Sequence, residues 1–217
     1  MSNSATPTSR TRVVRIPERG QYDRATIDAI LDEGFVCHVA FTVGDQPFVI
    51  PTGYVRYGDE IFVHGSAASR MIRAIEGGGA VCVTVTLVDG LVLARSAFHH
   101  SINYRSVVIL GRARLVSDVS EKTEALRCFT NHVVENRWEE VRKPTAQELK
   151  ATTVVAISLA ESSAKTRSGP PNDDEADNAW PVWAGVIPLR VEALAPVPAE
   201  DVSVSLAGFD VIRLKRR

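Results

Sequence analysis

The most informative stretch of this chain is Phe98-His99-His100-Ser101-Ile102-Asn103-Tyr104-Arg105-Ser106-Val107-Val108-Ile109-Leu110-Gly111. Its second half, from Val107 to Leu110, is β-branched or apolar and predicts a buried strand. Its first half places two His, two Ser, one Asn, one Tyr and one Arg within eight residues. Polar groups beside a buried strand need hydrogen-bond partners. We expect those partners to be either the protein's own backbone or a polar, anionic ligand.

A second segment, Val63-His64-Gly65-Ser66-Ala67-Ala68-Ser69-Arg70, has the same character. It lies where a predicted strand ends and a predicted helix begins. Free backbone N–H groups, the positive end of the helix dipole, hydroxyls and a guanidinium all favour an anion there. The Gly-Lys-Ser/Thr element of a Walker loop is absent, and a helix-capping Ser with a surface Arg is the alternative interpretation. Together the two segments indicate a bound phosphorylated cofactor.

Composition limits the other possibilities. The chain has 217 residues, 45% of them hydrophobic, which is enough for a full core, and its formal net charge is −1. We therefore expect no nucleic-acid and no membrane partner, and we interpret the basic end Lys215-Arg216-Arg217 as solvated surface. The first twenty residues lack the apolar segment of a secretory signal, which predicts a cytoplasmic protein. Cys37, Cys82 and Cys128 are widely spaced, so we expect reduced, structural thiols.

The pattern of apolar residues predicts an antiparallel α+β or barrel fold, with short turns between strands and no repeated βαβ unit. Helices are expected over 23–34 (capped by Asp23), 68–76, 120–137 and 145–150. Strands are expected over 35–41, 48–55, 61–64, 80–87, 91–94 (after a turn at Asp89-Gly90), 104–116, 152–159 and 182–189, the last closing the sheet. Residues 168–178 are predicted to form a loop. We expect a flexible arm over 1–20, one domain over 21–195 and a C-terminal extension over 196–217.

Other candidate sites are weaker. His99 and His100 are adjacent, so in a strand they point to opposite faces, and no carboxylate or cysteine is near them in sequence. We therefore predict no metal site. No nucleophile elbow is present, and no Cys/His pair has a supporting context for nucleophilic catalysis. Trp180 and Trp183 follow a polar loop and either pack in the core or form one wall of a pocket for a flat ring.

With these segments in order, the chain resembles the FMN-binding split-barrel superfamily, the pyridoxamine 5′-phosphate oxidase-like proteins. It is most similar to the flavin-nucleotide-binding branch that includes the nitroimidazole-resistance proteins. The resemblance runs from about Arg15 to Leu189. The segments that carry it are Tyr22–Ile27, His38–Phe41, Ile50–Thr52, His64–Met71, Asp89–Ser101, Asn103–Val108, Ser163–Pro171 and Trp183–Leu189.

The resemblance implies a six-stranded antiparallel split barrel with peripheral helices, a homodimer, and FMN in two clefts at the dimer interface. The residues that it assigns to the cofactor are Val49, Ile50, Pro51, Thr52, His64, Gly65, Ser69, Arg70, Met71, Asn103, Tyr104, Arg105, Ser106, Lys165, Thr166 and Trp183. Met71 stands where the oxidase has a phosphate-holding Lys, so Arg70 or another basic residue must compensate. The oxidase's C-terminal segment that binds pyridoxal phosphate is not matched, since Arg190 stands alone, and vitamin B6 oxidation is not expected.

Two classes of function follow from the resemblance. The first is an FMN-dependent oxidoreductase that takes electrons from NAD(P)H or another donor and reduces a small acceptor such as a nitro-aromatic or a quinone. His64, His99 and His100 are its candidate proton donors. The second is a non-catalytic protein that binds or stores flavin. A third possibility is a split barrel that uses deazaflavin or haem in place of FMN.

Overall fold

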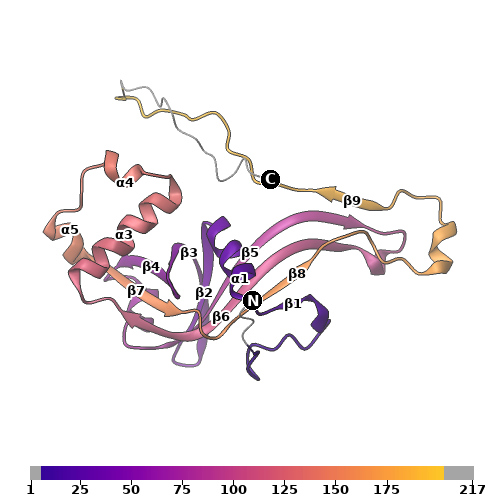
Figure 1. The fold of residues 1–217 in the computed structure, drawn as a ribbon, viewed down its shortest axis with the longest axis horizontal. Helices are drawn as coiled ribbons and strands as arrows, with labels where there is room; N and C mark the ends of the chain where they lie inside the picture. The colour runs from indigo at the N-terminus through magenta and orange to yellow at the C-terminus, as the bar shows by residue number, and fades with distance from the viewer. Residues whose placement is uncertain (1–5, 203–217) are drawn as a thin grey trace.

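The computed structural model describes residues 6–202, and its strands pair into a closed, split barrel (Figure 1). The strands of the closed ring are, in order of pairing, β6 (Ser101–Leu115), β7 (Thr152–Ser158), β4 (Glu60–Ser66), β3 (Gln46–Tyr57), β2 (Val36–Val43) and β5 (Ala80–Leu93), which pairs again with β6. Three further strands lie outside the ring: β8 (Ser162–Arg167) on β6, β1 (Gly20–Gln21) on β8, and β9 (Gly185–Pro188) on β5. All of these pairings are antiparallel. The predicted antiparallel barrel with peripheral helices is confirmed.

One hydrophobic cluster fills the barrel and is closed by two helices. α1 (Arg24–Glu33) begins at Asp23, whose carboxylate accepts the Thr26 backbone N–H, as the sequence predicts. The hydroxyl of the fully buried Tyr54 donates to the Leu31 carbonyl at 2.6 Å and fastens the end of α1 to β3. α2 (Arg70–Ile75) places Ile72 and two further apolar side chains in the same cluster.

Three helices cover the outer face of β3, β4 and β7. α3 (Val119–Val133), α4 (Arg137–Glu140) and α5 (Ala146–Ala151) gather beside these strands (Figure 1), and Ala125 of α3 packs against Val55 and Phe62. The predicted continuous helix over 120–137 is wrong. The chain leaves the helix at Val134, which is extended, and Asn136 adopts the left-handed conformation (φ 60°) before α4 starts.

A long hairpin of β5 and β6 extends from the barrel, with β8 and β9 beside it (Figure 1). The predicted turn at Asp89-Gly90 is wrong, because β5 continues through a bulge between Val88 and Gly90 and pairs with β6 as far as Val92. The chain reverses over 94–100 instead, where η2 (Ala97–His99) lies. β8 was not predicted, and the loop 168–178 contains the start of the 3₁₀ helix η3 (Glu175–Ala179). β9 is an outer strand and does not close the barrel.

The two ends of the described chain differ in their contacts. The described part of the expected N-terminal arm, which includes η1 (Pro17–Arg19), lies against the barrel: Val13 donates its N–H to the Tyr22 hydroxyl at 2.8 Å. After β9 the chain is extended and exposed, with Leu194 at 83% and Val197 at 91% exposure. The predicted basic end 215–217 lies outside the described residues. No described helix is long and apolar enough to cross a membrane.

Candidate functional site

The barrel is split between β3 and β4. β3 pairs with β2 from Gln46 to Gly53, but it pairs with β4 only from Tyr54 to Tyr57. Over the described residues, the second edge of β3 is therefore unpaired from 46 to 53. Its backbone N–H and C=O groups are available to a ligand. The predicted residues Val49, Ile50, Pro51 and Thr52 all lie on this open edge.

The ring of Phe129 from α3 lies at the split, beside Gly53 of β3 and His64 of β4. A Cβ atom on Gly53 would lie 2.9 Å from Phe129 Cε2, so only glycine fits opposite this ring. On the other side, the edge of the Phe129 ring meets His64, with the ring centroids 4.5 Å apart. Beyond the split, β4 no longer pairs with β3 and pairs only with β7, where Gly65 lies opposite Thr153. Burial lowers the pKa of His64, so its imidazole is neutral at neutral pH.

The predicted anion segment at α2 offers one charged side chain. Arg70 is exposed, and its guanidinium lies 4.9 Å from the centre of the Phe48 ring on β3. No carboxylate among the described residues is paired with it. Ser69 caps the helix without a side-chain hydrogen bond. Met71 is 5% exposed and packs in the core, so its side chain is not available to a cofactor.

The second predicted group lies on β6 and β8, where pairing brings its members together. Tyr104, Arg105 and Ser106 lie opposite Arg167, Thr166 and Lys165, and the Ser106 hydroxyl donates to the Lys165 carbonyl at 3.2 Å. The side chain of Arg105 makes its contacts elsewhere: it donates two hydrogen bonds to Glu33 (2.6 and 2.9 Å) and two to Asp89 (2.7 and 2.8 Å). These carboxylates raise the pKa of Arg105 and occupy its donors. Within one chain, Arg105 joins α1, β5 and β6, and its predicted contact with the cofactor stays a prediction.

Sequence reasoning missed a group of cations beside β8. Arg167 is 9% exposed, and it donates to the Asn103 side chain and to the Gly169 and Pro170 carbonyls. Burial, with Arg19 close by, lowers the pKa of Arg167. Lys165 donates to the Arg15 carbonyl at 2.9 Å. Within residues 6–202, no carboxylate is paired with Arg19, Lys165 or Arg167. Arg167 directly follows the predicted cofactor residues Lys165 and Thr166, and this adjacency could have indicated it as a site residue.

Within one chain, the residues at the open edge of β3 do not lie near the predicted residues on β6 and β8. β3 and β6 lie on opposite walls of the ring, since two strands separate them in either direction. The three candidate histidines are also separate: His64 is in the split, whereas His99 and His100 lie at the end of the long hairpin. Trp183 is 63% exposed, and its ring lies against Gly185 at the start of β9. It therefore lies on the hairpin extension, and it does not pack in the core.

We compared the chain with known protein families and solved structures. A family model described as pyridoxamine 5′-phosphate oxidase matches residues 23–166. The chain is 45% identical to the flavocytochrome Anf3 from Azotobacter vinelandii, covering 93% of this chain and 95% of that one, with a TM-score of 0.86. It is 34% identical to the FAD and heme binding protein from Mycobacterium smegmatis, covering 87% and 92% of the two chains, with a TM-score of 0.83.

A structure described as a 5-nitroimidazole antibiotic resistance protein from Bacteroides thetaiotaomicron shares the fold at 20% identity, covering 67% of this chain and 85% of that one, with a TM-score of 0.57. A search of curated proteins gave no match. The family model spans well over half of the chain and includes both walls of the split barrel. The chain belongs to the pyridoxamine 5′-phosphate oxidase family.

Proposed function

We propose that this protein is a redox protein of the flavocytochrome type, which binds a flavin nucleotide and a haem. The observation that carries the proposal is similarity over nearly the whole chain to two structures: one is called a flavocytochrome and the other an FAD and heme binding protein. When bound, a flavin supplies hydride and single-electron transfer, and a haem supplies single-electron transfer. NAD(P)H is the proposed donor, and a quinone or nitro-aromatic is the proposed class of acceptor.

The residues present fit a flavin nucleotide. The open edge of β3 provides backbone donors and acceptors for the polar rim of the ring system. Arg70 beside that edge and the cations Arg19, Lys165 and Arg167 beside β8 lack described carboxylate partners, so they suit phosphate groups. A buried guanidinium without a counter-ion is costly, and an anionic ligand would offset that cost.

The two sets of residues are proposed to meet across a homodimer. Since β3 and β6 lie on opposite walls, the open β3 edge of one copy would face the β6–β8 surface of a second copy. Exposed apolar side chains on the hairpin, on the loop before β9, on β9 and on the segment after it support such an interface. They include Leu91, Phe98, Ile102, Trp180, Ile187, Leu189, Leu194 and Val197.

His64 is the residue that would hold the haem iron, through an imidazole nitrogen. Its neutral imidazole retains a lone pair, no described residue hydrogen-bonds to its ring nitrogens, and its neighbours Phe62, Leu126 and Phe129 are apolar. The role of the residues around it would be to hold the imidazole in one orientation and to exclude water. His64 would then be a haem ligand and not the proton donor that the sequence suggests.

The identity of the flavin is proposed separately. The sequence favours FMN because it has no dinucleotide-type Gly-rich turn after a strand, whereas the relative from Mycobacterium smegmatis is described as binding FAD. Chromatography of the flavin released by heat distinguishes the two.

The test of the whole proposal is the absorption spectrum of the purified, tag-free protein, followed by anaerobic addition of NADH or NADPH. Flavin and haem bands that are both reduced by the nucleotide support the proposal. Bound flavin that no donor reduces, or that no quinone or nitro-aromatic reoxidises, would favour flavin storage. A spectrum with haem alone or with a deazaflavin would contradict the assigned cofactor pair.

A further inference from the structure

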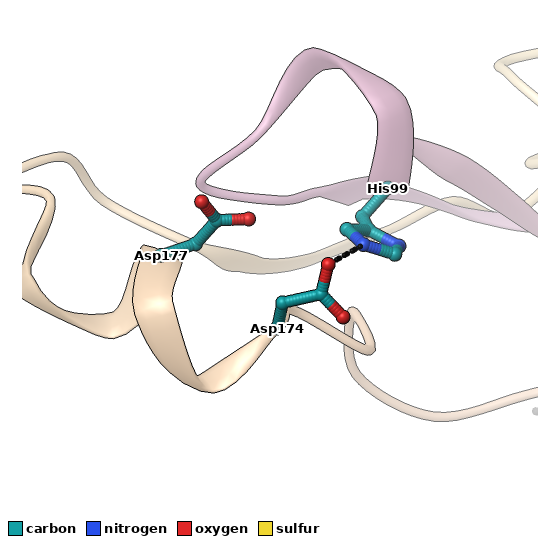
Figure 2. A group of neighbouring side chains, drawn as sticks. All are labelled: His99, Asp174 and Asp177. Carbon is teal, nitrogen blue, oxygen red and sulfur yellow. Dashed lines mark hydrogen bonds and ion pairs between the residues drawn. The ribbon is translucent and has the colours of Figure 1, made fainter.

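We propose that His99, Asp174 and Asp177 form a binding site for one divalent transition-metal ion at the end of the long hairpin. Figure 2 shows the three side chains turned toward one another, His99 from the turn after β5 and the two aspartates from the loop before β9. Their ligand atoms all lie within 4.8 Å of one another, and His99 Nε2 is 3.3 Å from Asp174 Oδ2. None of these three residues belongs to the set proposed to hold the flavin or the haem.

The local backbone aligns the two carboxylates. Asp174 is the N-cap of η3, and the Asp177 N–H donates to the Asp174 carbonyl at 2.9 Å, which closes one 3₁₀ turn. In such a turn, side chains three residues apart lie one above the other. Asp174 and Asp177 therefore face His99 together, although the histidine is 75 residues away in sequence from the first of them.

A neighbouring ion pair fixes the loop against the hairpin. Asp173 accepts the Arg95 N–H and an Arg95 guanidinium N–H, both at 2.9 Å, and its side chain is only 5% exposed. This contact holds the start of η3 beside His99, and it also neutralises Arg95. No described cation is paired with Asp177, and Asp174 is paired only with His99. The cluster therefore has excess negative charge in a fixed position.

The donor set selects the class of ion. Ligand bonds of about 2.0–2.2 Å to one centre require donor atoms roughly 3–3.5 Å apart. The His99–Asp174 pair, at 3.3 Å, already has this spacing, and the Asp177 carboxylate, within 4.8 Å of both, would move closer when an ion binds. An imidazole with two carboxylates suits Zn²⁺, Mn²⁺ or Fe²⁺, whereas Mg²⁺ and Ca²⁺ prefer oxygen donors alone. Asp174 is exposed, so water can complete the coordination. A bound ion would cross-link the hairpin end to the loop over 168–184.

Equilibrium dialysis of the tag-free holoprotein against Zn²⁺, after removal of metals with EDTA, tests the site. We expect one more Zn²⁺ per chain in the wild type than in Asp177→Asn or His99→Asn, each of which should weaken this binding about tenfold or more. Glu175→Gln and His100→Ala are matched controls, because both residues are close in sequence but outside the cluster, and they should bind as the wild type does. Zn²⁺ should also slow proteolysis of the loop over 168–184 in the wild type and not in Asp177→Asn.

Two results would overturn the site. One is a wild type that binds no Zn²⁺ under these conditions. The other is equal binding by the wild type, Asp177→Asn and His99→Asn, which would place the ion elsewhere. Flavin and haem content, measured on the same samples, should be unchanged in every variant, so failure of this site is distinguishable from failure of the proposed function.

Discussion

Replacing Arg70 with Ala tests whether the guanidinium at the start of α2 holds an anionic group of the flavin. Arg70 has no described carboxylate partner and is exposed beside the open edge of β3. A charge-assisted hydrogen bond contributes about 1.5–3 kcal/mol. Because the side chain is exposed and screened, we expect the lower value, about 1.5 kcal/mol, which is about a tenfold weaker Kd for flavin.

Arg73→Ala is the matched control, since Arg73 lies one turn further along the same helix and its guanidinium donates to the Ala67 carbonyl at 3.3 Å. Apoprotein of each variant is titrated with FMN and with FAD while flavin fluorescence is recorded, at low and at high salt. The Arg70→Ala defect should diminish as salt rises. An Arg70→Ala Kd within about twofold of the wild type, or an equal loss in Arg73→Ala, would refute the assignment.

Three further predictions concern stability. Gly34→Ala should lower the free energy of unfolding by about 1–3 kcal/mol in urea, because a Cβ atom would lie 2.7 Å from the buried Tyr54 hydroxyl; unchanged stability would show that the packing there yields easily. Arg105→Ala should cost roughly 2–3 kcal/mol in the same assay, because it removes the ion pairs that Arg105 makes with Glu33 and Asp89, and a loss under about 0.5 kcal/mol would mean that water replaces these ion pairs. The pKa of His64 is below its ordinary value of 6.5, so the unfolded state binds the proton more tightly, and wild-type stability should fall as pH drops below about 6.5. His64→Asn should reduce this dependence in melting curves from about pH 8 to pH 5, and parallel curves would contradict it.

The barrel could be predicted from the sequence because local signals agree with the final structure. Asp23 caps α1 as expected, and Thr145 and Glu148 form a reciprocal capping box at α5. Local signals failed where tertiary contacts decide. Asp89-Gly90 has the composition of a turn, yet the Asp89 carboxylate binds Arg105 on the neighbouring strand and Gly90 accommodates a bulge.

The candidate sites also differ in whether the local sequence reveals them. The open edge of β3 and the exposed Arg70 lie within continuous segments, so motif matching could find them. The His99–Asp174 pair joins residues 75 positions apart, and no sequence spacing indicates it. Arg167 is buried against Asn103 and backbone carbonyls. The sequence does not show which carboxylates come near it in the fold, so the absence of a paired carboxylate among the described residues could not be predicted.

Whether one protein holds both a flavin and a haem can be read from the absorption spectrum of the tag-free protein, recorded before and after anaerobic reduction with dithionite. We expect flavin bands that bleach and a haem Soret band that shifts on reduction, both from one species of about twice the 23.6 kDa chain mass. The Soret band should be lost in His64→Asn, while the flavin bands remain. A colourless protein that takes up neither flavin nor haem when they are added would contradict the claim.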